Sequence, residues 1–169
     1  MSQEFARRYG PLRQNEFMND KKHRILIVDD NAANRELLEA HLLGLDCELD
    51  FAEDGEQTLE RVAAAQPDLI LLDVMMPRLS GFEVCKQLKG NPETSNIMVL
   101  MVTALNELGD IERAVEAGTN DFLSKPVSRV ELLKRVENML QLKHISDENE
   151  RLRQYICKME EEGQQSSAS

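Results

Sequence analysis

The sequence predicts an α/β domain with five parallel strands and helices on both faces of the sheet. The first observation is that short, fully apolar runs, such as residues 69–72, end abruptly in a polar or charged residue. Such a run is too uniformly apolar for a half-exposed strand and is typical of a strand covered on both faces. The second observation is that these runs alternate with segments of helical periodicity. Strands that alternate with helices in this way form doubly wound parallel sheets.

The predicted elements follow one another in strict alternation. Strands are expected at residues 25–28, 48–52, 69–72, 97–102 and 121–124. Helices are expected at residues 31–43, 54–65, 80–90, 107–117 and 129–161. The connections between them are short, so right-handed crossovers are expected throughout.

Capping residues support the predicted helix boundaries. Asn31 is a suitable N-cap, and three pairs have capping-box spacing: Asp54 with Gln57, Ser80 with Glu83, and Ser128 with Glu131. Glycines follow the first and fourth helices at positions 44 and 118, where a helix C-terminus favours them. Pro67 prevents the second helix from continuing toward the strand at 69–72.

The composition argues against several classes of protein. The 169 residues carry 31 acids against 20 bases, a net charge of −11, which opposes sequence-independent binding to nucleic acid or anionic lipid. Cys47, Cys85 and Cys157 are far apart, odd in number and in no metal-ligand spacing, as in a cytoplasmic protein with reduced thiols. No apolar run approaches the length of a membrane-spanning helix, and residues 1–22 lack the core of a signal peptide. We expect residues 1–22 to form a flexible arm.

Charged and polar side chains follow four of the predicted strands. Asp29 and Asp30 follow the first, Asp73 the third, Thr103 the fourth and Lys125 the fifth. Because the carboxyl ends of parallel strands lie along the same edge, these residues are expected to converge. Three carboxylates in one site repel one another and need a cation, and an all-oxygen set without His or Cys favours Mg²⁺. A lysine and a hydroxyl beside them suit a phosphoryl group, so Asp73 is a candidate nucleophile in phosphoryl transfer.

Three of these residues also have a simpler explanation. Asp29 could serve only as a cap for the first helix, and Thr103 could be an ordinary residue at the end of a strand. Lys125 could be a solvated lysine, although Pro126 after it indicates a bend for which a cis peptide bond is one option. The histidines at positions 23, 41 and 144 have no partnering pattern, which argues against a phosphodonor histidine within this chain.

Six motifs follow one another along the chain: Ile27-Val28-Asp29-Asp30, Leu71-Leu72-Asp73-Val74-Met75-Met76-Pro77, Ser80-Gly81, Val102-Thr103-Ala104, Gly118 and Asp121-Phe122-Leu123-Ser124-Lys125-Pro126. Together they resemble the receiver domain of two-component response regulators. Their order and separations match the family from about residue 24 to 140. The resemblance implies a flavodoxin-like fold with strand order 2-1-3-4-5.

The resemblance also implies a role for each matching position. Asp73 would be the phosphoacceptor, phosphorylated by a sensor histidine kinase or a phosphotransfer protein. Asp30, Asp73 and the backbone carbonyl of Met75 would bind Mg²⁺ directly, and Asp29 would reach it through water. Thr103 and Lys125 would hold the phosphoryl oxygens, and Phe122 matches the aromatic residue that switches with Thr103. The apolar Met75 and Leu105, at two positions that tune hydrolysis in the family, predict a long-lived phosphorylated state.

The last predicted helix continues past the receiver region, which we place at residues 23–141. Within residues 142–162, the a and d positions of a heptad pattern are Leu142, Ile145, Asn149, Leu152, Ile156 and Met159. This pattern predicts a short coiled coil that forms a homodimer, and Asn149 at an a position favours two parallel helices. A solvated helix, or one that folds back on its own domain, is the alternative. Residues 163–169 are small and polar and are expected to be disordered.

The sequence therefore predicts a phosphorylatable response regulator without a separate output domain, rather than an enzyme acting on other substrates. Two alternatives remain. The first is a Mg²⁺-dependent phosphohydrolase with an aspartyl-phosphate intermediate, but such enzymes generally carry a second acid where Met75 stands. The second is a degenerate receiver that serves only as a scaffold, which the full set of acids, threonine and lysine disfavours. Neither the kinase nor the downstream target can be identified from the sequence.

Overall fold

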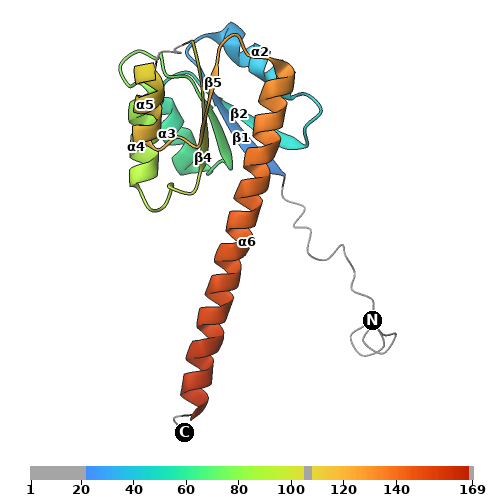
Figure 1. The fold of residues 1–169 in the computed structure, drawn as a ribbon, viewed down its shortest axis with the longest axis vertical. Coiled ribbons are helices and arrows are strands. Elements are labelled where there is room, and N and C mark those ends of the chain that lie inside the picture. Colours follow the sequence, from blue (N-terminus) through green and yellow to red (C-terminus); the bar gives the residue numbers. More distant parts are fainter. Residues whose placement is uncertain (1–21, 105–107, 168–169) are drawn as a thin grey trace, which may run out of the picture.

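A five-stranded parallel sheet with the order β2-β1-β3-β4-β5 forms the centre of the protein (Figure 1). The computed structural model describes residues 22–104 and 108–167. The strands are β1 (His23–Val28), β2 (Cys47–Ala52), β3 (Leu69–Leu72), β4 (Met98–Thr103) and β5 (Asp121–Ser124). The helices are α2 (Ala32–Leu42), α3 (Gly55–Ala64), α4 (Gly81–Gly90), α5 (Leu108–Ala117) and α6 (Arg129–Ser167). The predicted doubly wound fold and its strand order are confirmed.

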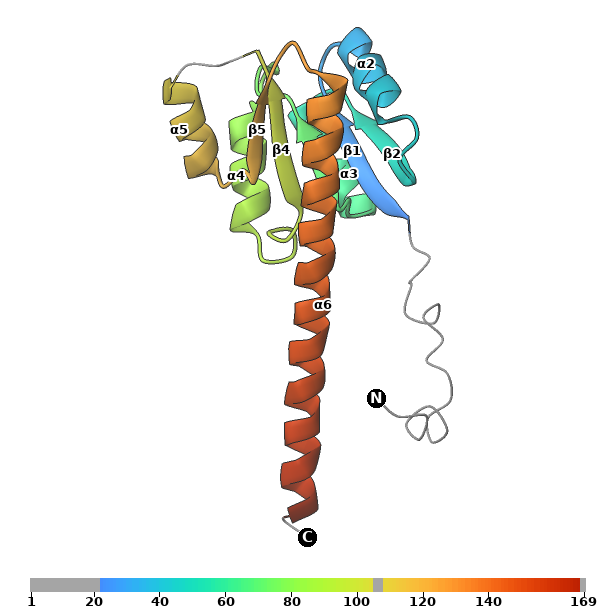
Figure 2. The same ribbon diagram turned by 45° about the vertical axis from the view of Figure 1, so that its right-hand side comes forward.

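Two layers of helices cover the sheet (Figure 2). Helices α2 and α6 lie on one face, and α3, α4 and α5 lie on the other. Side chains alternate between the two faces along each strand: Ile25 and Ile27 of β1 join the core under α2 and α6, whereas Leu26 and Val28 join the opposite core. This division explains why the strands are continuous apolar runs, because both faces are buried.

The register of β1 with its neighbours positions the polar residues that follow the strands. Val28, the last residue of β1, is level with Leu72 of β3 on one side and with Ala52 of β2 on the other. The chain continues this pairing for one more residue, since the Asp73 amide donates to the Val28 carbonyl at 2.9 Å. Asp29 and Asp73 are therefore held at the same edge of the sheet.

Side-chain caps mark the start of α2 and α4, the two helices that follow β1 and β3. The Asn31 side chain accepts from the Ala33 amide at 2.9 Å, and the reciprocal capping box of Ser80 and Glu83 is complete. The box predicted at Asp54 is only half formed. Asp54 accepts from the Gln57 amide, but the Gln57 side chain accepts from the Glu53 amide instead of the Asp54 amide.

Helix α6 runs further than the sequence predicted. It begins at Arg129, leaves the domain after its first turns and continues through Gly163 to Ser167, so residues 163–167 of the expected disordered tail are helical (Figure 1). Glycine lowers helix stability by about 1 kcal/mol but, unlike proline, neither removes a hydrogen-bond donor nor clashes with the preceding turn. The expected flexible arm, except Lys22, and the last two residues of the tail lie outside the described residues. Among the described helices, none is both long and apolar enough to cross a membrane.

Candidate functional site

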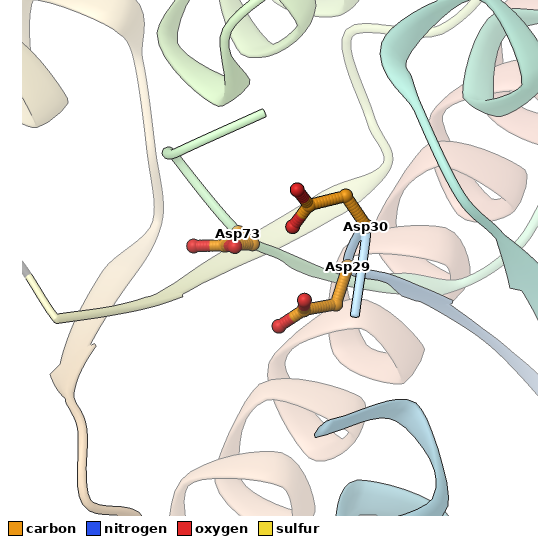
Figure 3. Close-up of side chains that lie close together, drawn as sticks. All are labelled: Asp29, Asp30 and Asp73. Carbon is orange, nitrogen blue, oxygen red and sulfur yellow. The ribbon is translucent and has the colours of Figure 1, made fainter. Parts of the chain in front are cut away.

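Three carboxylates converge at the carboxyl edge of the sheet. Asp29 and Asp30 follow β1, Asp73 follows β3, and their side chains lie close together in Figure 3. One oxygen from each can be chosen so that all three lie within 4.8 Å of one another. Asp29 and Asp73 are only 1% and 5% exposed, whereas Asp30 is open to solvent. The parallel topology thus brings together acids that lie more than forty positions apart in the sequence.

Lys125 supplies the opposite charge from the end of β5. Its ammonium group lies 2.7 Å from Asp29 Oδ2 and 3.7 Å from Asp73 Oδ2. The Lys125 amide donates to the Thr103 carbonyl at 2.8 Å, which holds the lysine backbone beside the end of β4. The peptide bond between Lys125 and Pro126 is cis. The ammonium group therefore lies between a firmly bound carboxylate and the candidate nucleophile.

Asp29 combines a place in this cluster with a local structural role. Its Oδ1 accepts from the Asn31 amide at 2.9 Å and from the Asn34 side chain at 3.3 Å. Its backbone carbonyl accepts from Arg35 at 2.7 Å. The simpler explanation, in which Asp29 only organises the start of α2, accounts for the Oδ1 contacts but not for the short contact between Oδ2 and Lys125.

The environment of Asp73 opposes its ionisation. Burial raises the pKa of the Asp73 carboxyl above its ordinary value of 3.8, and the negative charges of Asp29 and Asp30 raise it further. The Lys125 ammonium and the hydrogen bond from the Met75 amide, 3.3 Å from Asp73 Oδ1, act in the other direction. A carboxylate whose charge is costly in this way gains from a nearby cation.

The other predicted site residues surround this cluster. Thr103 is the last residue of β4 and is fully buried. Phe122 lies on β5 and is partly buried against the core beneath α3, α4 and α5. Met75 follows Asp73 closely, and its side chain is 60% exposed. The role of the Met75 carbonyl as a metal ligand stays a prediction, and Leu105 lies outside the described residues.

Two features of the site were missed by the sequence reasoning. One is the close packing of α4: a side chain at Gly81 would collide with the Asp73 backbone carbonyl. The other is a hollow of about 470 Å³ beside Asp30, bordered by the loop after β3 and by Arg113 of α5. The guanidinium of Arg113 lies 4.4 Å from the centre of the Phe82 ring. Gly81 could have been found from its place directly after the Ser80 cap, but nothing in the sequence pairs Arg113 with Phe82.

The donor set fits a hard divalent cation. Each of the three acids offers a carboxylate oxygen, and the cluster contains no histidine or cysteine. Oxygen-only sites with few protein ligands are the kind that Mg²⁺ occupies in phosphoryl-transfer proteins, where it keeps part of its water shell. With one ammonium against three carboxylates, the site also has the excess negative charge that such a cation would balance.

Comparison with known proteins identifies the family. The profile of the response regulator receiver domain matches residues 25–137, which is most of the chain. The chain belongs to the response regulator receiver family. Response regulator PleD of Caulobacter vibrioides is 46% identical over 125 residues, 74% of this chain but only 28% of PleD. Response regulator MprA of Mycobacterium tuberculosis is 40% identical over 117 residues, 69% of this chain and 50% of MprA.

Solved receiver structures agree with this assignment. The chemotaxis response regulator CheY4 of Vibrio cholerae matches with a TM-score of 0.66 and 27% identity, over 70% of this chain and 99% of CheY4. The BeF3-activated receiver domain of DrrB matches with a TM-score of 0.65 and 27% identity, over 72% and 99% of the two chains. This receiver therefore has the fold of its family, and it spans half or less of the length of PleD and MprA.

Proposed function

We propose that Asp73 is the phosphoacceptor of this receiver, and that a sensor histidine kinase or a phosphotransfer protein phosphorylates it in a two-component system. The observation that carries the proposal is the position of Asp73: nearly buried, within 4.8 Å of two other acids and 3.7 Å from Lys125. Burial and the two acids oppose ionisation, but the Lys125 ammonium favours the ionised carboxylate, which is the form that attacks a phosphoryl group.

Several residues of the site would each contribute to the transfer of the phosphoryl group. An Asp73 carboxylate oxygen attacks the phosphorus, the bond from phosphorus to the donor breaks, and the donor keeps the electron pair. Lys125 pairs with one phosphoryl oxygen, and the Thr103 hydroxyl donates to another. Asp29, Asp30, Asp73 and the Met75 carbonyl would hold Mg²⁺, which would neutralise the charge shared by the acids and the phosphoryl oxygens. The protein is then a signalling phosphoacceptor that catalyses only its own phosphorylation and dephosphorylation.

The signal would leave the site by two routes. Thr103 and Phe122 lie at neighbouring strands, where movement of the threonine toward a phosphate would let the ring repack. Beyond the domain, the a and d positions of α6 expose Leu142, Ile145, Leu152 and Ile156. We propose that residues 142–162 pair with a second copy in a short parallel coiled coil, whose geometry or stability changes with phosphorylation.

The remaining features support the same assignment. The strong negative charge opposes direct binding to nucleic acid or to an anionic membrane surface, and a histidine kinase would meet the receiver in the cytoplasm. The apolar Met75 cannot orient an attacking water by hydrogen bonding, which favours a long-lived phosphorylated state. Because Met75 stands where phosphohydrolases that form an aspartyl phosphate generally have an acid, no observation favours that alternative.

Intact-mass measurement tests the proposal. The wild-type protein and an Asp73→Ala variant are incubated with acetyl phosphate and Mg²⁺. One phosphoryl group should be added to the wild type and none to the variant. Circular dichroism should give the same spectrum for both proteins, so that a loss of labelling is not a loss of fold. Absence of an added group on the folded wild type, or equal labelling of the variant, would overturn the proposal.

A further inference from the structure

Asp30 is the acid of the cluster whose carboxylate has the least support. The Asp29 carboxylate accepts from the Asn31 amide at 2.9 Å and pairs with Lys125 at 2.7 Å. The Asp73 carboxylate lies 3.7 Å from the same ammonium group. Among the residues that the structure describes, none donates to the Asp30 carboxylate, which is open to solvent. In Figure 3 this carboxylate nevertheless points to the same side as the other two, so its direction is set by the backbone.

The peptide groups on both sides of Asp30 are held by hydrogen bonds. In the peptide group after it, the Asn31 amide donates to Asp29 Oδ1 at 2.9 Å. In the peptide group before it, the Asp29 carbonyl accepts from the Arg35 guanidinium at 2.7 Å. Each peptide group is planar, so holding both of them fixes the direction of the bond from Cα to Cβ between them. The Arg35 guanidinium is therefore one of two groups that aim the Asp30 side chain.

Arg35 is itself firmly placed. It lies in the first turn of α2, where its amide donates to the Asn31 carbonyl at 3.2 Å, and its side chain is only 15% exposed. Its two terminal nitrogens bind different acceptors, Nη1 the Asp29 carbonyl and Nη2 the Glu53 carboxylate at 3.2 Å. The planar fork of a guanidinium can span two such acceptors at once. Arg35 thus joins the loop after β1, which carries two of the acids, to the loop after β2.

We infer that Arg35 is a positioning residue for the divalent-cation site, and that it acts by holding the peptide group before Asp30 so that the Asp30 carboxylate faces the cation. The inference rests on the proposed function, because it assumes that the three acids hold Mg²⁺. The guanidinium bonds to a backbone carbonyl of the cluster rather than to one of its carboxylates. Arg35 therefore acts on the cation through Asp30.

Charge and position predict opposite effects when Arg35 is replaced by a neutral residue. As a positive charge near the acids, the guanidinium repels a second cation, so its removal alone would strengthen Mg²⁺ binding. As the group that aims Asp30, it favours the cation, so its removal would weaken Mg²⁺ binding. Partners that orient metal ligands in this way change metal affinity more than a single screened charge does. The sign of the change in affinity therefore separates the two roles.

The experiment measures the Mg²⁺ dissociation constant of the full chain by competition with Mn²⁺, whose free form is observed by electron paramagnetic resonance. Arg35→Met keeps an unbranched stem but has no donor, and Arg35→Lys restores a charged donor. Arg24→Met is the matched control, because Arg24 pairs with Glu48 at 3.0 Å but lies at the start of β1, away from the acids. The dissociation constant should rise about tenfold in Arg35→Met and stay within about threefold of wild type in Arg35→Lys. Arg24→Met should stay within about twofold of wild type.

Two further measurements separate positioning from a general loss of structure. In an Asp30→Asn background, Arg35→Met should change the dissociation constant by less than about twofold, because the ligand that Arg35 aims has already lost its charge. In the metal-free protein, ¹⁵N relaxation should show greater mobility of the Asp30 amide in Arg35→Met and not in Arg24→Met. Circular dichroism checks that each variant is folded. If Arg35→Met does not fold, Arg35→Gln, which has a shorter stem and no charge, replaces it and should also weaken binding.

The outcomes distinguish the inference from the function on which it rests. Unchanged or tighter Mg²⁺ binding by folded Arg35→Met, or an equal weakening in the Asp30→Asn background, would overturn the role of Arg35 and leave the metal site and Asp73 as proposed. Failure of the wild type to bind Mg²⁺ would instead overturn the metal site of the proposed function, and the role of Arg35 with it.

Discussion

The carboxyl edge of the sheet and the outer half of α6 depart in opposite ways from the usual distribution of residues. At the edge, ionisable groups are buried: Asp29 and Asp73 are 1% and 5% exposed. On α6 beyond the domain, large apolar side chains are in solvent: Ile145 and Leu152 are 53% and 56% exposed. Buried charge and exposed apolar surface both raise the free energy of an isolated chain.

The difference between the two regions indicates what each one binds. Buried carboxylates beside an ammonium gain from a divalent cation, and the cation and the ammonium together can pair with an anionic phosphoryl group. A helical stripe of apolar side chains gains from a second helix with the same pattern. The first region is closed by its own tight packing, whereas the second has no packing partner in the described part of the chain. Substitutions in the first region should therefore change the free energy of unfolding, whereas substitutions in the second should change the dimer dissociation constant.

The largest effect is expected from Gly81→Ala. A Cβ at this position would collide with the Asp73 carbonyl and the Val74 backbone, neither of which can move without disturbing the end of β3. We expect the free energy of unfolding to fall by about 3 kcal/mol, measured by urea denaturation.

Gly90→Ala is the matched control for that experiment. Gly90 is the last residue of the same helix, and a Cβ there would meet nothing within 4 Å. It should leave stability unchanged or raise it by about 0.5 kcal/mol, as alanine does in helices. Equal destabilisation by both substitutions would show that the edge of the sheet is not closely packed around Asp73.

The next effect is expected on association rather than on folding. Leu152→Lys places a charge at a d position of the seam, and Gln154→Lys places the same charge on the outer face of the same helix. Sedimentation should give a dimer dissociation constant at least about tenfold higher for Leu152→Lys and nearly unchanged for Gln154→Lys. The thermal unfolding of the receiver region should be alike in both. A monomeric wild type, or equal weakening by both variants, would exclude the coiled coil.

The third prediction concerns the charge of Asp73. Because its folded-state pKa is raised, the native protein binds more protons than the unfolded chain between the two pKa values. The free energy of unfolding therefore falls as pH rises from about the unfolded value of 3.8 through the folded pKa, and it stays lower above that window. Without Mg²⁺, Asp73→Asn should raise stability at neutral pH by about 1 kcal/mol.

Two further stability measurements complete that test: addition of Mg²⁺, and a control substitution at a solvent-exposed acid. Mg²⁺ should stabilise the wild type and should stabilise Asp73→Asn less, because one ligand has lost its charge. Asp46→Asn, at a carboxylate that is mostly in solvent, should change stability by no more than about 0.5 kcal/mol with or without metal. Destabilisation by Asp73→Asn in metal-free buffer would contradict the account of the buried charge.

The smallest effect is expected at Arg78, which has a φ of 67° and forms a solvent-exposed ion pair with Asp54. A non-glycine residue is strained in this region, and an exposed ion pair contributes little. Arg78→Gly should stabilise the protein by about 0.5 kcal/mol, whereas Arg78→Ala, which keeps the strain and loses the pair, should not. Stabilisation by alanine as well as by glycine would assign the effect to the lost arginine rather than to the backbone.

The residues that sequence reasoning placed correctly are those whose position follows from topology. Once residues 25–28 and 69–72 were read as parallel strands, Asp29 and Asp73 had to share an edge, and Lys125 had to approach them from the end of another strand. Contacts between side chains of different helices could not be predicted from the sequence. The Phe82–Arg113 pair depends on how α4 packs on α5. The spacing of Asp54 and Gln57 also did not reveal that the Gln57 side chain accepts from the Glu53 amide instead of the Asp54 amide. The predicted α6 was too short because Gly163 was expected to end the helix.

The most direct test of the central claim is to locate the phosphoryl group among the three acids. The protein is labelled with acetyl phosphate and Mg²⁺, reduced with borohydride, which converts an aspartyl phosphate to homoserine, and mapped by peptide mass spectrometry. The account predicts homoserine at position 73 and intact aspartate at positions 29 and 30. Homoserine at position 29 or 30, or a phosphoryl group on any other residue with Asp73 unchanged, would contradict it.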